Sequence, residues 1–440
     1  MEHSNSEYTD VVIYKGRDPK ECVLNGIDKL GGISNFIKDD DQVFIKFNLS
    51  LPQGFPSHTN MDTLGAIIGS CLKAGAKKIY VGSFPIKGMT IKSISDLLGL
   101  KRFFLKIGAE LVFLDNSDYY YQKNIDVKHL KIIKNRNFSI VKVNGKEITF
   151  PKIILESDKY ISVNQLSVDP IFKVRLSILN SYSATIYKYQ ENLVRTNSLK
   201  EFASLVSDLY SLKKPDLVIN DIFYILEGAG PHIYRDSNFK KTGLMVLGTD
   251  TIAVDMITLK LINANNILYE EAVNRNLGIH DISRINIIGE NPDNIKISVK
   301  ECVSKLEDIN VPNFHIKAGK MFLGEFEQAY HLLNLLKSYM IKDIKYLSKT
   351  SFLIGINPPE PEILNNIILF GDNAIKSTKL KKNMRFLKLT GNPPNFLECI
   401  GSLVKFFGKG IVPTSNFFQK VNKAYMNQRT KRQLKIWEAL

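Results

Sequence analysis

The sequence predicts an α/β fold: a parallel-rich, mixed sheet flanked by helices, followed by a smaller C-terminal α/β unit. Three observations support this prediction. Short apolar runs of strand length alternate with segments that have helical apolar spacing. Several of these runs end in glycine or in small polar residues. Between residues 43 and 82, strand, loop, helix, glycine and strand follow one another, which is typical of a right-handed βαβ unit.

The βαβ unit comprises two predicted strands and one predicted helix. The apolar run at residues 43–48 predicts the first strand, and the run at residues 79–82 predicts the second. Helical spacing over residues 61–74 ends at Gly75, a residue suited to closing a helix. An irregular loop rich in proline and glycine occupies residues 49–60. We expect both strands to lie parallel in one sheet.

Further segments extend the same pattern. Asn144–Gly145, placed between alternating apolar residues, predicts a β-hairpin. The remaining signals predict strands at residues 11–14, 111–114, 159–164 and 285–289, and helices at residues 94–107, 199–212 and 251–262.

Residues 216–255 contain the strongest candidate for a functional site. A short apolar run reaches the polar pair at residues 220–221, and a glycine-rich turn follows at residues 227–231. A second apolar run, at residues 244–247, leads to Asp250, which we expect to cap a helix. In open α/β sheets, ligands bind beyond the carboxyl ends of the strands. The polar strand ends are therefore expected to share one binding cleft.

The chain is expected to divide near residue 310, where prolines interrupt the pattern. Residues 1–310 would form the main α/β domain and residues 311–440 the smaller unit. The second part contains a long helical pattern at residues 321–346 and apolar runs that end in glycine, asparagine and proline. Residues 416–440 have the pattern of a basic helix, which we expect to be solvated or to dock rather than to anchor in a membrane.

The composition is that of an ordinary globular protein, with 44% hydrophobic residues in 440. No apolar run approaches the roughly 20 residues of a membrane span, and the polar start of the sequence is not a secretory signal. A cytoplasmic location is expected. The net charge of +15 is compatible with an acidic partner, but lysines are scattered along the chain. Four widely spaced cysteines lack any Cys-x-x-Cys motif, so no iron–sulfur cluster is expected.

The order of these motifs resembles the domain of unknown function 362 family, whose members are often described as iron–sulfur centre proteins. The resemblance covers about residues 10 to 290. It is carried by residues 43–48, 58–59, 74–82, 214–221, 227–231 and 248–255. The family has no settled general activity, so the resemblance implies a fold more than a reaction.

The sequence departs from the family pattern after Asn164. Relatives typically continue with Pro-Lys-x-Lys-Thr-His and then a Lys-Asn pair. Here residues 165–173 contain no histidine, and Leu179–Asn180 replaces the pair. The cysteine clusters of many relatives are also absent. If the histidine and lysine carry the family's chemistry, this chain has lost it.

Three candidate residues lie in the predicted strand at residues 43–48 or in the loop that follows it. Lys46 and Asn48 could hold an anionic group, with the lysine as a point charge and the asparagine as a fixed donor. The alternative is a solvated lysine and a chain-turning asparagine. His58 could act as a general base or a ligand, or lie at the surface before a helix.

The glycine-rich turn supplies the other main candidates. Glu227 and Asp221 could transfer protons or bind a divalent cation such as Mg²⁺. Gly228 and Gly230 would let the backbone approach a ligand closely, although a structural turn could use the same residues. Asp255 could face the site. It lies five residues after Asp250, so on one helix the two side chains would point to different sides and would not form a carboxylate pair.

The resulting hypothesis is a protein that binds a small anionic ligand or substrate in a cleft at strand ends. Ligand-binding residues would be Lys46, Asn48, Gly228, Gly230, Asn180 and Asp255, and Asp221, Glu227 and His58 would be catalytic in an enzyme. One alternative is a non-catalytic ligand-binding or partner-docking protein that has lost the family's activity. Another, less favoured, is a basic nucleic-acid binder. No catalytic triad, phosphate loop or dinucleotide fingerprint names a reaction.

Overall fold

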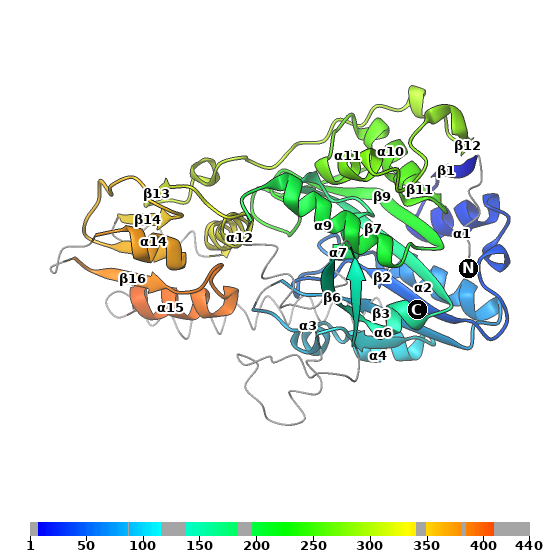
Figure 1. Cartoon of the computed structure of the whole chain (residues 1–440), viewed down its shortest axis with the longest axis horizontal. Helices are drawn as coiled ribbons and strands as arrows, with labels where there is room; N and C mark the ends of the chain where they lie inside the picture. Colours follow the sequence, from blue (N-terminus) through cyan, green and yellow to red (C-terminus); the bar gives the residue numbers. More distant parts are fainter. Residues whose placement is uncertain are drawn as a thin grey trace.

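The fold was analysed in a computed structural model. It describes residues 8–86, 88–115, 138–143, 145–182, 196–339, 349–379 and 384–408. These residues form two helix-flanked sheets and a separate hairpin (Figure 1). The predicted α/β class is therefore confirmed.

The large sheet has the strand order β12-β1-β11-β9-β7-β2-β3-β4, with β10 paired to β9 and β8 paired to β7. Its strands are β1 (Thr9–Lys15), β2 (Gln42–Phe47), β3 (Lys78–Ser83), β4 (Glu110–Phe113), β7 (Lys159–Asp169), β8 (Lys173–Val174), β9 (Leu217–Glu227), β10 (Asn238–Lys241), β11 (Leu244–Gly248) and β12 (Ile285–Gly289).

Most central strands of this sheet run parallel. β2 lies parallel to β3 and β7, β3 to β4, and β7 to β9. β11 is antiparallel to both β9 and β1, so the sheet is mixed. From β2 the chain moves outward to β3 and β4, and it then returns to the other side of β2 as β7. The order of strands thus reverses between β2 and β7.

Helices cover both faces of the large sheet. One face packs against α1 (Pro19–Lys29), α2 (Met61–Lys73), α3 (Ile91–Leu98) and α4 (Leu100–Lys106). The other packs against α9 (Leu199–Leu212), α10 (Thr251–Ile262) and α11 (Ile267–Asn274). The second face also contacts the hairpin of β5 (Phe138–Val143) and β6 (Lys146–Pro151), α6 (Lys152–Glu156) and α7 (Leu179–Tyr182).

Capping residues explain where several helices begin. Asn60 begins α2 by accepting a hydrogen bond from the backbone N–H of Asp62. Asp250 begins α10 by accepting from the N–H groups of Ile252 and Ala253, as predicted. The hairpin predicted around Asn144–Gly145 is also present, although Asn144 itself lies outside the described residues.

The second sheet has the order β13-β14-β15-β16 and is entirely parallel. It comprises β13 (Phe314–Ala318), β14 (Thr350–Ile354), β15 (Ile367–Phe370) and β16 (Phe386–Leu389), with α12 (Leu323–Tyr339), α14 (Gly371–Ser377) and α15 (Phe396–Gly408). Short 3₁₀ helices occupy Ile33–Asn35, Ile282–Arg284, Pro292–Asn294 and Leu306–Ile309. The smaller α/β unit is confirmed, whereas the boundary at residue 310 stays a prediction.

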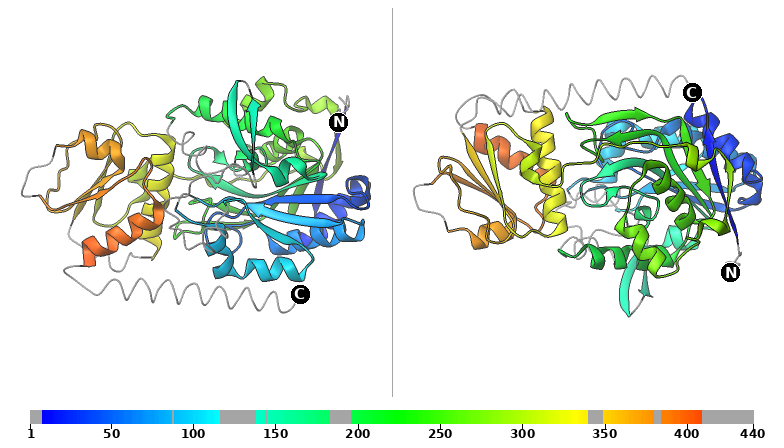
Figure 2. Two further views of the ribbon diagram at one scale, coloured as in Figure 1. Left: turned by 60° about the horizontal axis from the view of Figure 1, so that its bottom comes forward. Right: turned by 90° about the horizontal axis from the view of Figure 1, so that it is seen from above.

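The two sheets are joined through α12, which lies between them in every view (Figures 1 and 2). Leu332 and Leu333 of α12 share an apolar cluster with Leu51, from the loop after β2, and with Ala229 and Tyr234, from the loop after β9. Both loops therefore rest on the second unit.

Two sequence expectations differ from the structure, and a third is not tested by it. The predicted helix at residues 94–107 is two helices, because Gly99 adopts a left-handed conformation with φ of 69°. Strands β7 and β9 are each 11 residues long, so Asn164 and Asn220 lie inside strands rather than at their ends. They face each other in the sheet, where the side chain of Asn164 donates to that of Asn220 at 2.8 Å. The predicted basic helix at residues 416–440 lies outside the described residues.

Candidate functional site

A small polar pocket opens where the order of strands reverses. Its cavity volume is about 40 Å³, which suits a group the size of a few water molecules. Segments at the carboxyl ends of β2, β3 and β7 contribute most of the wall, as expected for ligand sites in α/β sheets. The lining residues are Asn48, Leu49, Ser50, Pro56, Ser57, Ser83, Phe84, Gln165, Ser167, Arg175 and Pro231.

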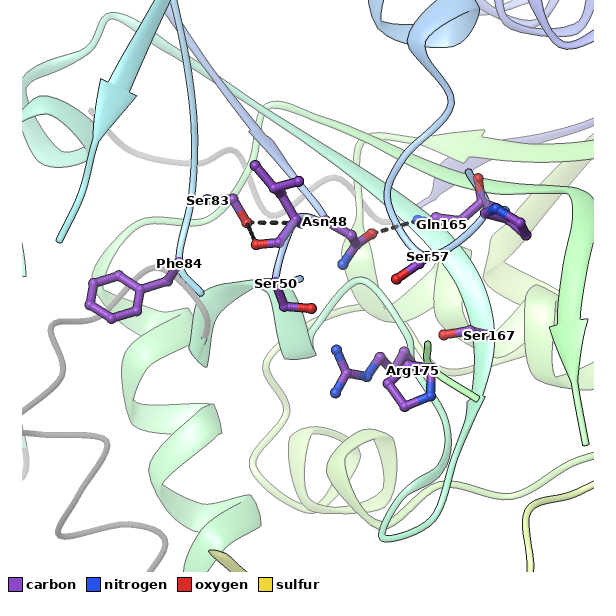
Figure 3. Close-up of a pocket in the computed structure, with 11 residues that line it drawn as sticks. Asn48, Ser50, Ser57, Ser83, Phe84, Gln165, Ser167 and Arg175 are labelled. Carbon is purple, nitrogen blue, oxygen red and sulfur yellow. Dashed lines mark hydrogen bonds between the residues drawn. The ribbon is translucent and has the colours of Figure 1, made fainter. Parts of the chain in front are cut away.

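Hydrogen-bond donors gather in this pocket. Figure 3 shows the hydroxyl groups of Ser50 and Ser57, the amide of Asn48 and the guanidinium of Arg175 directed towards a common space. The amide of Asn48 is oriented by the backbone N–H of Gln165, which donates to its Oδ1 at 2.6 Å. Its Nδ2 is consequently the atom that faces the pocket.

Arg175 is held by a carboxylate on each side. Its Nε donates to Oδ2 of Asp169 at 2.9 Å, and its Nη2 lies 3.7 Å from Oε1 of Glu327 on α12. Asp169 is itself fixed, because its Oδ1 accepts from the backbone N–H groups of Ile171 and Phe172. Within the described residues, Nη1 of Arg175 has no such partner, so it can donate to a ligand.

Lys46 is a buried cation immediately behind the pocket wall. Its side chain is fully buried, and its Nζ donates to the carbonyl of Phe47 at 2.8 Å and to Oγ of Ser83 at 3.3 Å. Burial, followed by the positive charge of Arg175, lowers the pKa of Lys46 to about 7. No carboxylate in the described part of the chain pairs with it.

A buried polar network holds the segment that carries Arg175. Both carboxylate oxygens of Asp255 are used, because the backbone N–H groups of Ser177 and Ile178 each donate to one of them at 3.0 Å. Asn220 donates to the same carboxylate at 2.9 Å. Burial raises the pKa of Asp255 to about 7, although these hydrogen bonds oppose the rise.

Asn180 connects this segment to the pocket. Its Nδ2 donates to Oγ of Ser162 on β7, and its Oδ1 accepts from Nδ2 of Asn48 at 3.0 Å. Asn180 thus positions a pocket residue without lining the pocket itself.

The site lies in a region of the chain that matches a known protein family. Residues 43–260 match the family described as Domain of unknown function (DUF362). This part of the chain belongs to the DUF362 family. All of the pocket-lining residues named above lie within the matched range.

Comparison with solved structures gives a weaker likeness. A crystal structure of a protein from Thermotoga maritima, a structural genomics target, aligns with a TM-score of 0.32 and 11% sequence identity. The alignment covers 52% of this chain and 57% of that one, so it spans little more than half of the Thermotoga protein. No curated protein matches the chain.

Three predicted catalytic residues lie outside the pocket of this DUF362 region. Asp221 is buried on the α2 side of the sheet, where Thr63 donates to it at 2.8 Å, and burial raises its pKa to about 6. Nδ1 of His58 lies 2.7 Å from the carbonyl of Thr59. Glu227 accepts from Asn238 and from the backbone of Lys300, each at 3.0 Å. None of these three side chains lines the pocket.

The two glycines of the turn have structural partners. Gly228 has φ of 84°, and its N–H donates to the carbonyl of Lys300. Gly230 packs so closely on β7 that a Cβ would lie 2.3 Å from the carbonyl oxygen of Val168. Gly230 therefore shapes the wall by placing Pro231.

The described residues offer little for a metal centre. They contain no group of three or more His, Cys, Asp or Glu side chains suited to a metal ion. The four cysteines are free thiols on separate segments, and the expected absence of an iron–sulfur cluster stays a prediction. The expected Mg²⁺ stays a prediction. The described helices include none that could cross a membrane.

Sequence reasoning missed much of the pocket wall. Ser83 follows an apolar strand that ends in glycine, which is a recognisable signal. Arg175 had no such signal, because it lies in a mixed apolar and basic stretch that departs from the family pattern. Of the nine residues predicted for the site, Asn48 alone lines the pocket, while Lys46 and Asn180 contact residues of its wall.

Proposed function

We propose that this DUF362 chain binds a small anionic molecule, with the charged group of that molecule in the pocket beside Arg175. The observation that carries the proposal is the convergence of donors from Asn48, Ser50, Ser57 and Arg175 at the carboxyl ends of parallel strands. A carboxylate or a tetrahedral oxyanion is the chemistry that such donors recognise.

The volume and the charges support the same class of ligand. A cavity of about 40 Å³ accepts a charged head group rather than a whole cofactor. Arginine presents a planar fork that matches an oxyanion with two hydrogen bonds. Lys46, directly behind Ser83, adds a second basic group without a carboxylate partner among the described residues.

The proposal concerns recognition. The carboxylates that were expected to transfer protons or to hold Mg²⁺, Asp221 and Glu227, lie outside the pocket wall and have protein partners.

Thermal unfolding with sulfate, phosphate and acetate tests the proposal. A ligand at free concentration L that binds only the folded state stabilises it by RT ln(1 + L/Kd), so the melting temperature rises with the logarithm of ligand concentration above Kd. The wild type should show this rise with at least one anion, and titration calorimetry should show saturable binding of the same anion. Arg175→Met should reduce the affinity by at least about tenfold, since a charge-assisted hydrogen bond contributes roughly 1.5–3 kcal/mol.

Arg275→Met provides a matched control. Arg275 is also half-buried and pairs with two carboxylates, Asp208 and Glu271, each at 2.7 Å, but it does not line the pocket. This variant should retain wild-type anion affinity while losing a comparable ion pair. Sulfate also stabilises proteins non-specifically, and the control removes that contribution. Equal affinities for the wild type and Arg175→Met would contradict the proposal.

A further inference from the structure

Lys46 is a charged group for which the described residues supply no opposite charge. Among the residues that the structure describes, its Nζ hydrogen-bonds only to neutral oxygen atoms, the carbonyl of Phe47 and the hydroxyl of Ser83. Burying an ammonium group without a counter-charge is unfavourable, so such a group tends to lose its proton. The protonation of Lys46 therefore depends on whatever charge enters its surroundings.

The groups that face Lys46 leave this charge uncompensated. From β3 comes the hydroxyl of Ser83, and the residue beside Lys46 on β7 is Ser162. The segment before α7 contributes Arg175, whose positive charge also disfavours protonation of Lys46. Tyr160, further back on β7, is titratable, but burial raises its pKa and keeps it neutral.

The pocket brings the missing charge within reach. Ser83 lines the pocket and accepts from Nζ of Lys46, so one hydroxyl group separates the amine from the cavity. An anion beside Arg175 would also offset the repulsion between that guanidinium and the lysine. Both effects favour the protonated amine when the pocket is filled.

We propose that anion binding in this pocket is coupled to protonation of Lys46, so that the protein takes up one proton with its ligand. This inference rests on the proposed function. By linkage, the ligand binds more tightly to the protonated protein, and its affinity falls as the pH rises through the range in which Lys46 loses its proton. Burial lowers the pKa of Lys46 to about 7, which places this range near neutrality.

Calorimetric titration with sulfate tests the coupling. Sulfate keeps the same charge between about pH 6 and about pH 9, so changes in affinity over this range report on the protein. At about pH 8, binding enthalpies measured in buffers of different ionisation enthalpy should show uptake approaching one proton per sulfate. The affinity should fall by up to about tenfold per pH unit above neutrality.

Two lysine variants identify the group that takes up the proton. Lys46→Met should bind sulfate with an affinity that no longer depends on pH and without proton uptake. Lys159→Met is the control. Lys159 is the first residue of β7, away from the pocket residue Gln165 further along the strand, and it pairs with Asp216. It should keep the wild-type pH dependence. The buffer dependence of the wild type needs no variant, so a folding defect in Lys46→Met would not prevent the test.

The outcomes separate this inference from the proposed function. Sulfate binding that requires Arg175 but takes up no proton would overturn the coupling and leave anion binding standing. Unchanged proton uptake in a folded Lys46→Met would also overturn it. If the wild type binds none of the anions, both proposals fail.

Discussion

Gly230 has no space for even one additional carbon atom. A Cβ at this position would meet the carbonyl oxygen of Val168 at 2.3 Å and its Cγ2 at 2.9 Å. The clash involves backbone, which cannot move aside as the end of a flexible side chain can. The glycine is thus needed for close packing between the turn after β9 and strand β7.

Gly230→Ala should accordingly destabilise the protein by about 1–3 kcal/mol, the usual cost of overpacking. Gly65→Ala is the control within the same family region, because a Cβ at Gly65 in α2 meets nothing within 4 Å. That change should stabilise the helix by roughly 0.5–1 kcal/mol. Urea unfolding measures both free energies. A neutral Gly230→Ala would show that the turn can shift and that the close contact is unimportant.

The place of a single residue in the site was predictable from the sequence only where the local pattern of apolar and polar residues indicates it. Lys46 and Asn48 follow from the parity of a short strand and its end, and the structure places them behind and in the pocket wall. Arg175 reaches the pocket through ion pairs with Asp169 and with Glu327, which is over 150 residues away in the sequence. No local pattern contains such a partner.

At the scale of elements, strands β7 and β9 run through polar residues that the sequence suggested would end them. Asn164 and Asn220 satisfy each other across the sheet, and Asn220 also donates to Asp255 and Thr258 of α10. Because these partners come from different elements, the polar residues were mistaken for strand ends. The same network fixes the segment between β7 and α7.

Asp255→Asn should loosen that segment. An amide has one acceptor oxygen, so the N–H of Ser177 or of Ile178 would lose its partner, at a cost of roughly 1–3 kcal/mol. Because Arg175 lies in this segment, anion affinity should fall as well. Asp293→Asn, on an exposed ion pair with Lys260, is the control and should change both quantities little. Urea unfolding and sulfate titration of each variant are the measurements. Wild-type stability in Asp255→Asn would argue against this role.

At the scale of the whole molecule, a buried histidine pair joins the two units. His232 follows β9 and His331 lies on α12, and their ring centroids are 4.8 Å apart. Ser57 of the pocket wall contacts Nδ1 of His232 at 3.0 Å, and Tyr234 contacts Nδ1 of His331 at the same distance. Burial, and then the charges of His331 and Arg175, hold the pKa of His232 well below 6.5.

This arrangement predicts a loss of stability in mild acid. Below pH 6.5 the unfolded chain binds a proton at this histidine and the folded chain does not, so the free energy of unfolding falls as the pH decreases. His232→Gln should lessen this dependence, whereas His280→Gln, at an exposed position, should keep it. Urea unfolding between about pH 5 and about pH 8 provides the comparison. Identical pH profiles for the wild type and His232→Gln would refute the prediction.

The sequence indicated two α/β units but not how they touch. Parallel strands and their order follow from apolar runs and crossover rules. The contact between the units depends on side chains such as Tyr234 and His331, nearly one hundred residues apart, whose burial is decided only when both units are folded.

The position of α12 bears on how this protein can be dissected. The loops after β2 and β9, which carry Ser57 and Pro231, rest on an apolar surface that α12 supplies through Leu332 and Leu333. A fragment containing only the large sheet would expose Leu51, Ala229 and Tyr234 to water and leave both loops without a support. Ligand screens on such a truncated product would sample a different cavity, so crystallisation and assay work should retain both halves of the polypeptide.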